Sequence, residues 1–323
     1  MVKYMWEYRE INEMNTDSWT IKSLNDTTGI LSYILISLLC QESVDQGIPH
    51  KYKSFINKKL LDGNAEELIF VLCASAEQLF FRDNKWTTEK VLCYLECVNN
   101  DFVQLSWEGF IYGLNSFDIT FMNTVLPIFH RNVSARKLLN TEHRNQFIYA
   151  YILMLVYIES GDIYSHIGKL LKDSTDEDKY YFAFSIKQIL ENMLPDQRSE
   201  LWNRWLKEYW KSRNENVPER LCEREFEEML EWTLLLENEF DEAVELVCKS
   251  EINKISYFIM DDLKNSKVID NFPVKVAELL IYILKRCDLR YSKPEIIDIV
   301  EKLKKYRVSD EIIRELNELV SRM

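Results

Sequence analysis

Apolar residues recur along almost the whole chain at the spacing of one face of an α-helix. Trp202, Trp205 and Tyr209 show this most clearly, because they follow one another at intervals of three and four residues. We therefore expect an all-α protein. The pattern predicts helices near residues 28–45, 50–61, 64–82, 87–99, 105–114, 118–139, 142–160, 162–172, 176–193, 196–213, 219–237, 239–249, 254–266, 272–287, 293–306 and 309–322.

Taken in pairs, these helices form hairpins joined by short turns. The predicted hairpins span residues 64–99, 105–139, 142–172, 176–213, 219–249, 254–287 and 293–322. In an α-solenoid each such hairpin buries its apolar face against its neighbours. Because no consensus repeat is visible, we predict an irregular stack of antiparallel helical hairpins, a HEAT-like α-solenoid. We divide it into an N-terminal helical segment, central hairpins and C-terminal hairpins, at residues 1–62, 63–195 and 196–323.

The composition agrees with long helices and few turns. The chain has 323 residues, of which 47% are hydrophobic, but it contains only 7 glycines and 6 prolines. Rossmann folds, barrels and β-sandwiches need many tight turns, for which glycine and proline are the usual residues. These fold classes are therefore disfavoured.

The net charge indicates which classes of partner to expect, and the cysteines indicate the cellular compartment. The net charge is −13, and such a surface repels phosphate backbones, so nucleic acid is not an expected partner. The 7 cysteines are scattered, several of them in apolar runs, as in reduced cytosolic proteins. We see no signal peptide, and the longest apolar runs, 30–40 and 147–158, are too short to span a membrane. Both runs are expected to be buried core helices in a cytoplasmic protein.

The chain carries none of the common nucleotide-binding, protease or hydrolase motifs. Cys93 and Cys97 lie four residues apart and could form half of a metal site, but no second pair matches them. The acidic run 176–178 follows Thr175, as expected at the capped N-terminus of a helix. We therefore predict no metal site, no cofactor and no enzyme activity.

One alternative involves Arg136 and His143, which are separated by six residues. This spacing is found in helical HEPN-type ribonucleases, where the histidine acts as acid or base and the arginine holds the phosphate. Such a spacing also arises by chance in many sequences. A metal-independent ribonuclease that uses these two residues stays an alternative hypothesis.

An acidic stripe is a candidate interaction surface. Glu223, Glu227 and Glu231 recur every four residues and share one helix face. They could pair with the cations Arg204, Lys207 and Lys211 of the preceding helix and so fix the register of the two helices. Alternatively, they could form a docking surface for a basic partner.

Trp210 is the second candidate. It lies beside the row formed by Trp202, Trp205 and Tyr209 and not on it. We expect the three row residues in the core. Trp210 could be partly exposed, where a large aromatic side chain would anchor an interface.

A family resemblance begins with these tryptophans. It rests on Trp202-x2-Trp205-Leu206-x2-Tyr209-Trp210-x2-Arg213, then Val217-Pro218, then Glu225-x3-Met229-x-Glu231-Trp232 and Phe240-x2-Ala243-Val244. This stretch, roughly 199–322, resembles a helical domain of unknown function that in bacteria often follows a sirtuin-like NADase domain in antiphage defence proteins. The glycine-rich loop and catalytic histidine of the NADase are not found in this chain, so that activity does not carry over.

The resemblance implies a sensing, oligomerising or inhibitory role for the helical part. We therefore predict a non-enzymatic helical scaffold or sensor that binds a protein partner, either an effector or a phage protein, in bacterial antiphage defence. An architectural subunit of an unrelated complex is a further alternative.

Overall fold

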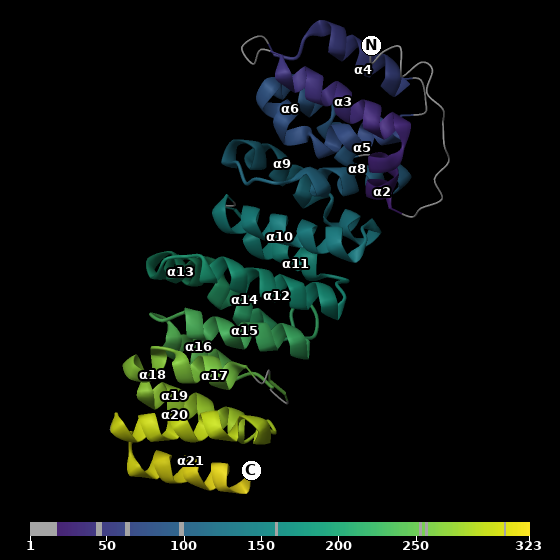
Figure 1. Ribbon diagram of the computed structural model, residues 1–323. Helices are drawn as coiled ribbons and strands as arrows, with labels where there is room; N and C mark the ends of the chain where they lie inside the picture. Colours follow the sequence, from purple (N-terminus) through teal and green to yellow (C-terminus); the bar gives the residue numbers. More distant parts are fainter. Residues whose placement is uncertain are drawn as a thin grey trace. The chain divides into compact units, whose positions relative to one another are not determined.

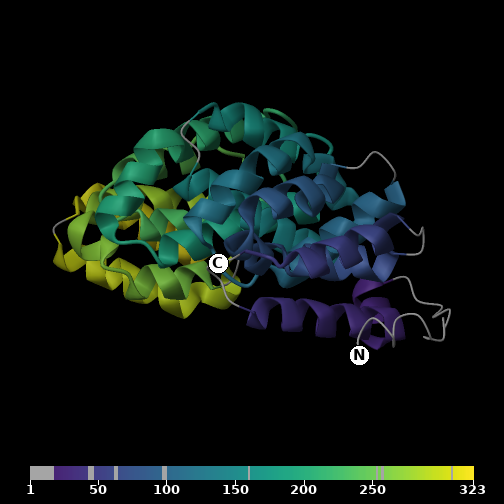
Figure 2. The same ribbon diagram turned by 90° about the horizontal axis from the view of Figure 1, so that it is seen from above.

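The prediction of an all-α fold is confirmed. The computed structural model describes residues 18–42, 47–61, 65–96, 100–158, 161–251, 254–255, 258–306 and 308–323. Across these ranges Figures 1 and 2 draw coiled ribbons and no arrows. The chain forms two compact units, Met1–Ile158 and Glu159–Met323, and each is described by itself. The boundary falls inside the stretch 63–195, and the predicted three-part division stays a prediction.

In the described part of the first unit, one residue, Asp26, lies between the first two helices and caps both. Its helical elements are α2 (Trp19–Asn25), α3 (Thr27–Gln41), α4 (His50–Leu61), α5 (Glu66–Ala74), α6 (Ala76–Arg82), α7 (Asn84–Lys90), η2 (Leu92–Glu96), α8 (Asn100–Gly113), α9 (Ile119–Arg131), η3 (Val133–Leu138) and α10 (Thr141–Tyr157). The sequence pattern missed α2. Asp26 ends this helix, and its carboxylate accepts the backbone N–H of Thr28 at 2.7 Å, which starts α3.

Three predicted helices of this unit are interrupted, one of them the stretch 87–99, which is divided at Val91 into α7 and η2. The stretch 64–82 is divided at Ser75 into α5 and α6, and the stretch 118–139 is divided at Asn132 into α9 and η3. The Asn132 amide donates to the carbonyl oxygen of Ile128 at 3.0 Å, and such a side-chain bond competes with the backbone bonds of the next turn. An apolar period alone does not reveal these breaks.

Helix α8 lies at the centre of the first unit, in contact with α2, α5, α10, η2 and η3. Trp107 of α8 packs against Phe129 and Phe147, with ring centroids 4.8 and 4.9 Å apart. Its indole N–H donates to the carbonyl oxygen of Leu95 at 3.1 Å. A buried tryptophan with a satisfied N–H and several aromatic neighbours stabilises one arrangement of these helices.

The contact between α5 and α8 depends on two glycines. A Cβ added to Gly109 would lie 2.5 Å from the carbonyl oxygen of Phe70, and one added to Gly113 would lie 1.8 Å from that of Ala74. Both obstacles are backbone atoms of α5. The two helices therefore approach more closely than any larger residue at these positions would allow.

The second unit is a succession of short and medium helices. Its elements are α11 (Ile163–Leu171), α12 (Asp176–Glu191), α13 (Pro195–Leu201), η4 (Trp202–Leu206), α14 (Lys207–Asn214), α15 (Glu223–Leu235), α16 (Phe240–Val247), α17 (Ile259–Asn265), α18 (Val268–Asn271), α19 (Pro273–Leu284), η5 (Arg290–Ser292), α20 (Lys293–Lys305) and α21 (Asp310–Arg322). The predicted capped start of α12 is confirmed. Thr175 Oγ1 accepts the N–H of Asp178 at 3.1 Å, and the Asp178 carboxylate accepts that of Thr175 at 3.3 Å.

Helices of the second unit contact near neighbours in two rows (Figure 1). One row runs from α12 through α15 and α17 to α20, and the other from α14 through α16 and α19 to α21. Each apolar face is thus buried against the next helix of its row. The pairing of these helices into antiparallel hairpins and the HEAT-like solenoid both stay predictions.

Within the ranges that the structure describes, no single helix is long and apolar enough to cross a membrane. Helices α2 and α3 reach that length and composition only when taken together, and they are bent by 77° at the break between them.

Candidate functional site

The tryptophan cluster of the second unit fixes the helix that leads to the candidate site. Residues Trp202–Leu206 form one turn of π-helix, in which the N–H of Lys207 donates to the carbonyl oxygen of Trp202. In a regular helix Trp210 would lie about 80° around the axis from Trp202. The π-turn takes up one extra residue, which reduces that angle to about 20°.

The predicted exposure of Trp210 is therefore wrong. Its side chain is 0% exposed, with the ring centroids of Trp202 and Trp232 at 6.1 and 5.6 Å. Trp210 cannot anchor an interface without unfolding, because its whole surface is already covered. The predicted burial of Trp202, Trp205 and Tyr209 is confirmed.

After α14 the chain forms a loop that a single buried arginine holds in place. The side chain of Arg213 is 1% exposed, and that of its partner Glu225 is fully buried. The two form a bidentate pair, with Nε to Oε1 at 2.6 Å and Nη2 to Oε2 at 2.8 Å. Tyr209 donates a further hydrogen bond to Oε1 at 2.8 Å. Both charges are thus compensated inside the unit.

The remaining donors of Arg213 bind the loop backbone. Nη1 donates to the carbonyl oxygens of Val217 and Glu219 at 3.0 and 2.6 Å, and Nη2 donates to that of Arg220 at 3.2 Å. All five N–H groups of the guanidinium therefore have an acceptor. The sequence analysis missed this role, although the position of Arg213 four residues after Tyr209 was a signal that it shares the buried face.

The loop has a defined backbone of its own. Asn216 adopts a left-handed conformation with φ of 61°, and its side-chain oxygen accepts the N–H of Leu221 at 3.2 Å. The peptide bond between Val217 and Pro218 is cis. Val217 is 52% exposed at the surface of this otherwise fixed loop. We call residues 215–222 the clamped loop.

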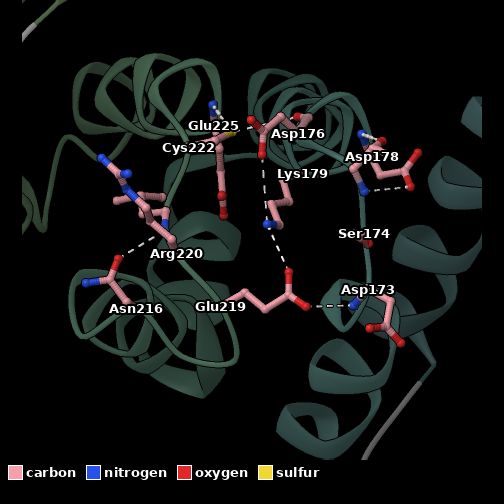
Figure 3. A network of polar contacts seen from close by, with 12 residues as sticks. Asp173, Ser174, Asp176, Asp178, Lys179, Asn216, Glu219, Arg220, Cys222 and Glu225 are labelled. Carbon is pink, nitrogen blue, oxygen red and sulfur yellow. Dashed lines mark hydrogen bonds and ion pairs between the residues drawn. The ribbon is translucent and has the colours of Figure 1, made fainter.

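A polar network joins the clamped loop to the start of α12 (Figure 3). Lys179 is almost buried, and its ammonium lies 3.0 Å from Glu219 and 3.9 Å from Asp176. Glu219 also accepts the backbone N–H of Asp173 at 2.8 Å. The Asp173 N–H and the Lys179 ammonium together hold the pKa of Glu219 below its usual value, so this carboxylate stays ionised.

Cys222 closes the network at the N-terminus of α15. Its sulfur accepts the N–H of Glu225 at 3.4 Å and donates to the carbonyl oxygen of Asp176 at 3.7 Å (Figure 3). Burial raises the pKa of the Cys222 thiol, which keeps it protonated and poorly nucleophilic. Its role here is to cap a helix.

Two cavities flank the clamped loop. The first has a volume of about 220 Å³, and the second, of about 370 Å³, lies toward α12. Residues 220–223 line both cavities and separate them. The loop therefore presents a preformed, indented surface.

The acidic stripe on α15 does not have the partners expected for it. Glu231 pairs with Lys187 of α12, and Lys207 and Lys211 instead pair with Glu242 and Glu208. The predicted pairing of Lys207 and Lys211 with the acidic stripe is therefore wrong. Helix α15 instead packs along α12, and this contact fixes its register. Glu223 is exposed and Glu227 is half-buried, and their role in docking a basic partner stays a prediction.

Glu228, beside the stripe, has an unusual environment. Its carboxylate is 13% exposed and lies 3.7 Å from the Lys187 ammonium. Because Lys187 lies closer to Glu231, the cost of burial dominates and raises the pKa of Glu228 to about 7. Burial alone would lower the pKa of Lys187, yet the hydrogen bond to Glu231 keeps it above its ordinary value.

The alternative ribonuclease pair lies in the interior of the first unit. Arg136 is 1% exposed and donates to the carbonyl oxygen of Val133 at 2.9 Å, while His143 is 6% exposed and lies 3.5 Å from Glu108. An RNA phosphate could not reach either side chain without a rearrangement of the surrounding helices. This geometry disfavours the ribonuclease hypothesis without testing it.

One of the two cysteines of the possible metal half site lies within the described residues. Cys97 lies outside the described residues, whereas Cys93 is exposed. Within the part of the chain that the structure describes, no group of three or more His, Cys, Asp or Glu side chains is placed to hold a metal ion.

An apolar surface that the sequence analysis did not predict lies on α2 and α3. Helix α3 has no charged residue, and its Ile30, Ile34 and Leu38 are 45%, 40% and 40% exposed. Ile21 and Leu24 of the adjoining α2 are 50% and 41% exposed. The expectation that residues 30–40 are buried all round is therefore wrong on this side. We call these five residues the apolar face.

The other long apolar run behaves as predicted. From Phe147 to Val156 almost every side chain is buried, because α10 packs against α8, α9 and η3. The two runs have similar hydropathy, so the sequence alone could not tell which of them leaves one side uncovered.

Comparison with known proteins gives a family match. Residues 152–320 match the family described as a domain of unknown function, DUF4020. This range contains the residues on which the resemblance rests and extends it toward the N-terminus, close to the boundary between the two units. No curated protein and no solved structure matches the chain. Because the match covers more than half of the sequence, the protein belongs to the DUF4020 family.

Proposed function

We propose that this protein is a non-enzymatic helical scaffold or sensor that binds a protein partner in bacterial antiphage defence. The defence context is supported by the resemblance of residues 199–322 to helical domains that follow sirtuin-like NADases. On this hypothesis the chain acts in the cytoplasm, and its partner is an effector or a phage protein.

The apolar face is the observation that carries the proposal. Five large aliphatic side chains are 40% to 50% exposed on two adjoining helices, while the opposite side of α3 is buried. Contiguous exposed apolar surface is uncommon on proteins that act alone and often marks a protein interface.

The arrangement favours a helix of the partner. Ile30, Ile34 and Leu38 recur every four residues, so they form one ridge along α3. An amphipathic helix can place its own apolar side chains beside such a ridge, as in helix-in-groove recognition. No charged residue of α3 would lose its hydration in that contact.

The test is affinity purification of the tagged chain from its native host, with and without phage, followed by mass spectrometry. The wild type is compared with the double substitution Ile34→Asp/Leu38→Asp, which places two charges on the ridge. The matched control is Ile119→Asp. Ile119 is 60% exposed in the same unit and lies at the first position of α9, where an acidic side chain is tolerated.

We expect an effector or phage protein to be recovered with the wild type and with Ile119→Asp, and lost with the double substitution. Recovery of the chain alone in both conditions would contradict a sensor. Recovery of the same partner with all three proteins would place the interface elsewhere.

Two further outcomes would support the alternatives. RNA cleavage by the purified chain that is abolished by His143→Ala would support the ribonuclease. A partner set that does not change on infection would support an architectural subunit.

A further inference from the structure

We propose that the smaller cavity beside the clamped loop binds an acidic peptide segment of a partner protein, with aspartate or glutamate carboxylates held by Arg220, Lys249 and Lys254. This site lies in the second unit and is independent of the apolar face. Its lining comes from the end of α14, the clamped loop, the start of α15 and the chain after α16.

Three exposed cations surround this cavity of about 220 Å³. Arg220, Lys249 and Lys254 each line it, and none of them forms an ion pair with another described residue. Lys254 influences the Glu227 carboxylate only as a nearby charge. The net charge of the chain is −13, so three cations at one cavity that pair with no carboxylate are unusual. Their charges are available to a ligand.

Arg213 also lines the cavity but is not a ligand-binding residue. All five of its donors are already used by Glu225 and by the loop carbonyls. Its contribution is to fix the loop that carries Arg220. A cation on a fixed loop loses less conformational entropy on binding than a cation on a mobile one.

The start of α15 adds to the attraction for a carboxylate. Cys222 and Glu223 line the cavity, so the first turn of this 13-residue helix faces it. The first N–H groups of a helix have no partner within it, and its dipole favours negative charge there. Glu223 and Glu225 in the same turn offset part of this attraction, so the three cations carry the site.

The remaining lining favours a peptide over a nucleic acid. Glu223 and Glu251 lie at the same cavity and would repel a continuous phosphate backbone. Leu221 and Phe226 provide apolar surface, and the exposed Val217 lies on the same loop. Carboxylates spaced along a peptide can avoid the two glutamates while a neighbouring apolar side chain contacts Leu221.

The experiment measures fluorescence anisotropy of a labelled peptide in which aspartates flank a leucine. The same peptide with asparagine in place of aspartate, and a labelled oligouridylate of equal charge, serve as comparison ligands. The full chain is compared with Arg220→Glu/Lys254→Glu. Lys169→Glu/Lys172→Glu is the matched control, because it changes the net charge equally at exposed lysines of the same unit that line neither cavity.

We expect the aspartate peptide to bind the wild type and the control alike, and to bind Arg220→Glu/Lys254→Glu about tenfold or more weakly. Binding should also weaken as salt is raised. Equal binding of the asparagine peptide would overturn the proposal, as would equal weakening in both variants. Oligouridylate bound as tightly as the peptide would overturn the choice of ligand.

Discussion

At the scale of single residues, the pair of Arg213 and Glu225 is the most constrained contact in the second unit. Replacing Arg213 with Met would leave the Glu225 carboxylate buried without a counter-charge. Removing one partner of a buried ion pair costs about 3–5 kcal/mol, so we expect a loss of that size in the free energy of unfolding. Urea denaturation followed by circular dichroism measures it.

The double substitution Arg213→Met/Glu225→Leu provides the control. It removes both charges and leaves only the loss of the loop contacts, so it should be less destabilising than Arg213→Met alone. If the single variant were as stable as the double, Glu225 would not depend on this arginine.

Trp210 is a second residue whose substitution has a predictable effect. Because it is buried, its replacement should lower stability. Trp210→Ala would leave a cavity between Trp202 and Trp232, and such truncations cost about 3–5 kcal/mol of stability. Thermal unfolding would detect this loss. An unchanged unfolding midpoint would show that Trp210 is not part of the core.

Glu228 makes stability depend on pH. With its pKa raised to about 7 from 4.5, the folded protein keeps a proton that the unfolded chain releases between these two values. The free energy of unfolding therefore falls as pH rises from about 4.5 to about 7, and the loss is complete above that range. Glu228→Gln removes this dependence.

We accordingly expect Glu228→Gln to gain roughly 1–3 kcal/mol relative to the wild type between pH 5 and pH 8. Urea denaturation of both proteins at the two pH values measures the difference. A difference that does not change with pH would show that Glu228 is ionised in the folded protein over the whole range.

At the scale of elements, the contact between α5 and α8 makes a sharp prediction. Gly113→Ala places a methyl group where the Ala74 carbonyl lies, so the helices must separate, and overpacking of this kind costs about 1–3 kcal/mol. Gly168→Ala on α11 is the control, since a Cβ there meets nothing within 4 Å. That change should be neutral or slightly stabilising, because alanine favours helix.

Thermal unfolding of the two glycine variants separates these effects. Equal midpoints for Gly113→Ala and the wild type would mean that α5 and α8 can separate without cost.

The element scale also shows what periodicity can and cannot predict. Apolar spacing identified most helices because burial on one face imposes a period of 3.6 residues. It missed α2, which has only seven residues, and it missed the breaks at Ser75 and Asn132. The Asn132 side chain bonds to a backbone carbonyl at one break, and such a bond leaves no periodic trace, whereas Ser75 makes no side-chain cap bond at the other.

The candidate site was less predictable than the fold for the same reason. The clamped loop depends on bonds from Arg213 to carbonyl oxygens of residues that share no pattern. The apolar face was missed because hydropathy does not say which side of α3 is covered. In both cases the deciding information is the position of neighbouring helices.

At the scale of the whole molecule, the division into two compact units predicts independent folding. Each unit has its own aromatic core, around Trp107 in the first and around Trp202, Trp210 and Trp232 in the second. The family match begins near the boundary at residue 158. We expect residues 159–323, expressed alone, to be helical and to unfold cooperatively in urea.

A fragment that lacks cooperative unfolding would show that the second unit needs the first. The intact chain, measured under the same conditions, provides the reference for helical content.

The π-turn at Trp202–Leu206 determines which single-residue deletions this helix could accept during evolution. A lineage that lost the codon for Asn203, an exposed residue within that turn, would convert it to an ordinary helical turn. Trp210 and Arg213 would stay on the same face of the helix, because the π-turn contains one residue more than a regular turn and the deletion removes it. Losing a codon within α14 before Arg213 would instead rotate the following residues by about 100° around the helix axis. Arg213 would then no longer face Glu225.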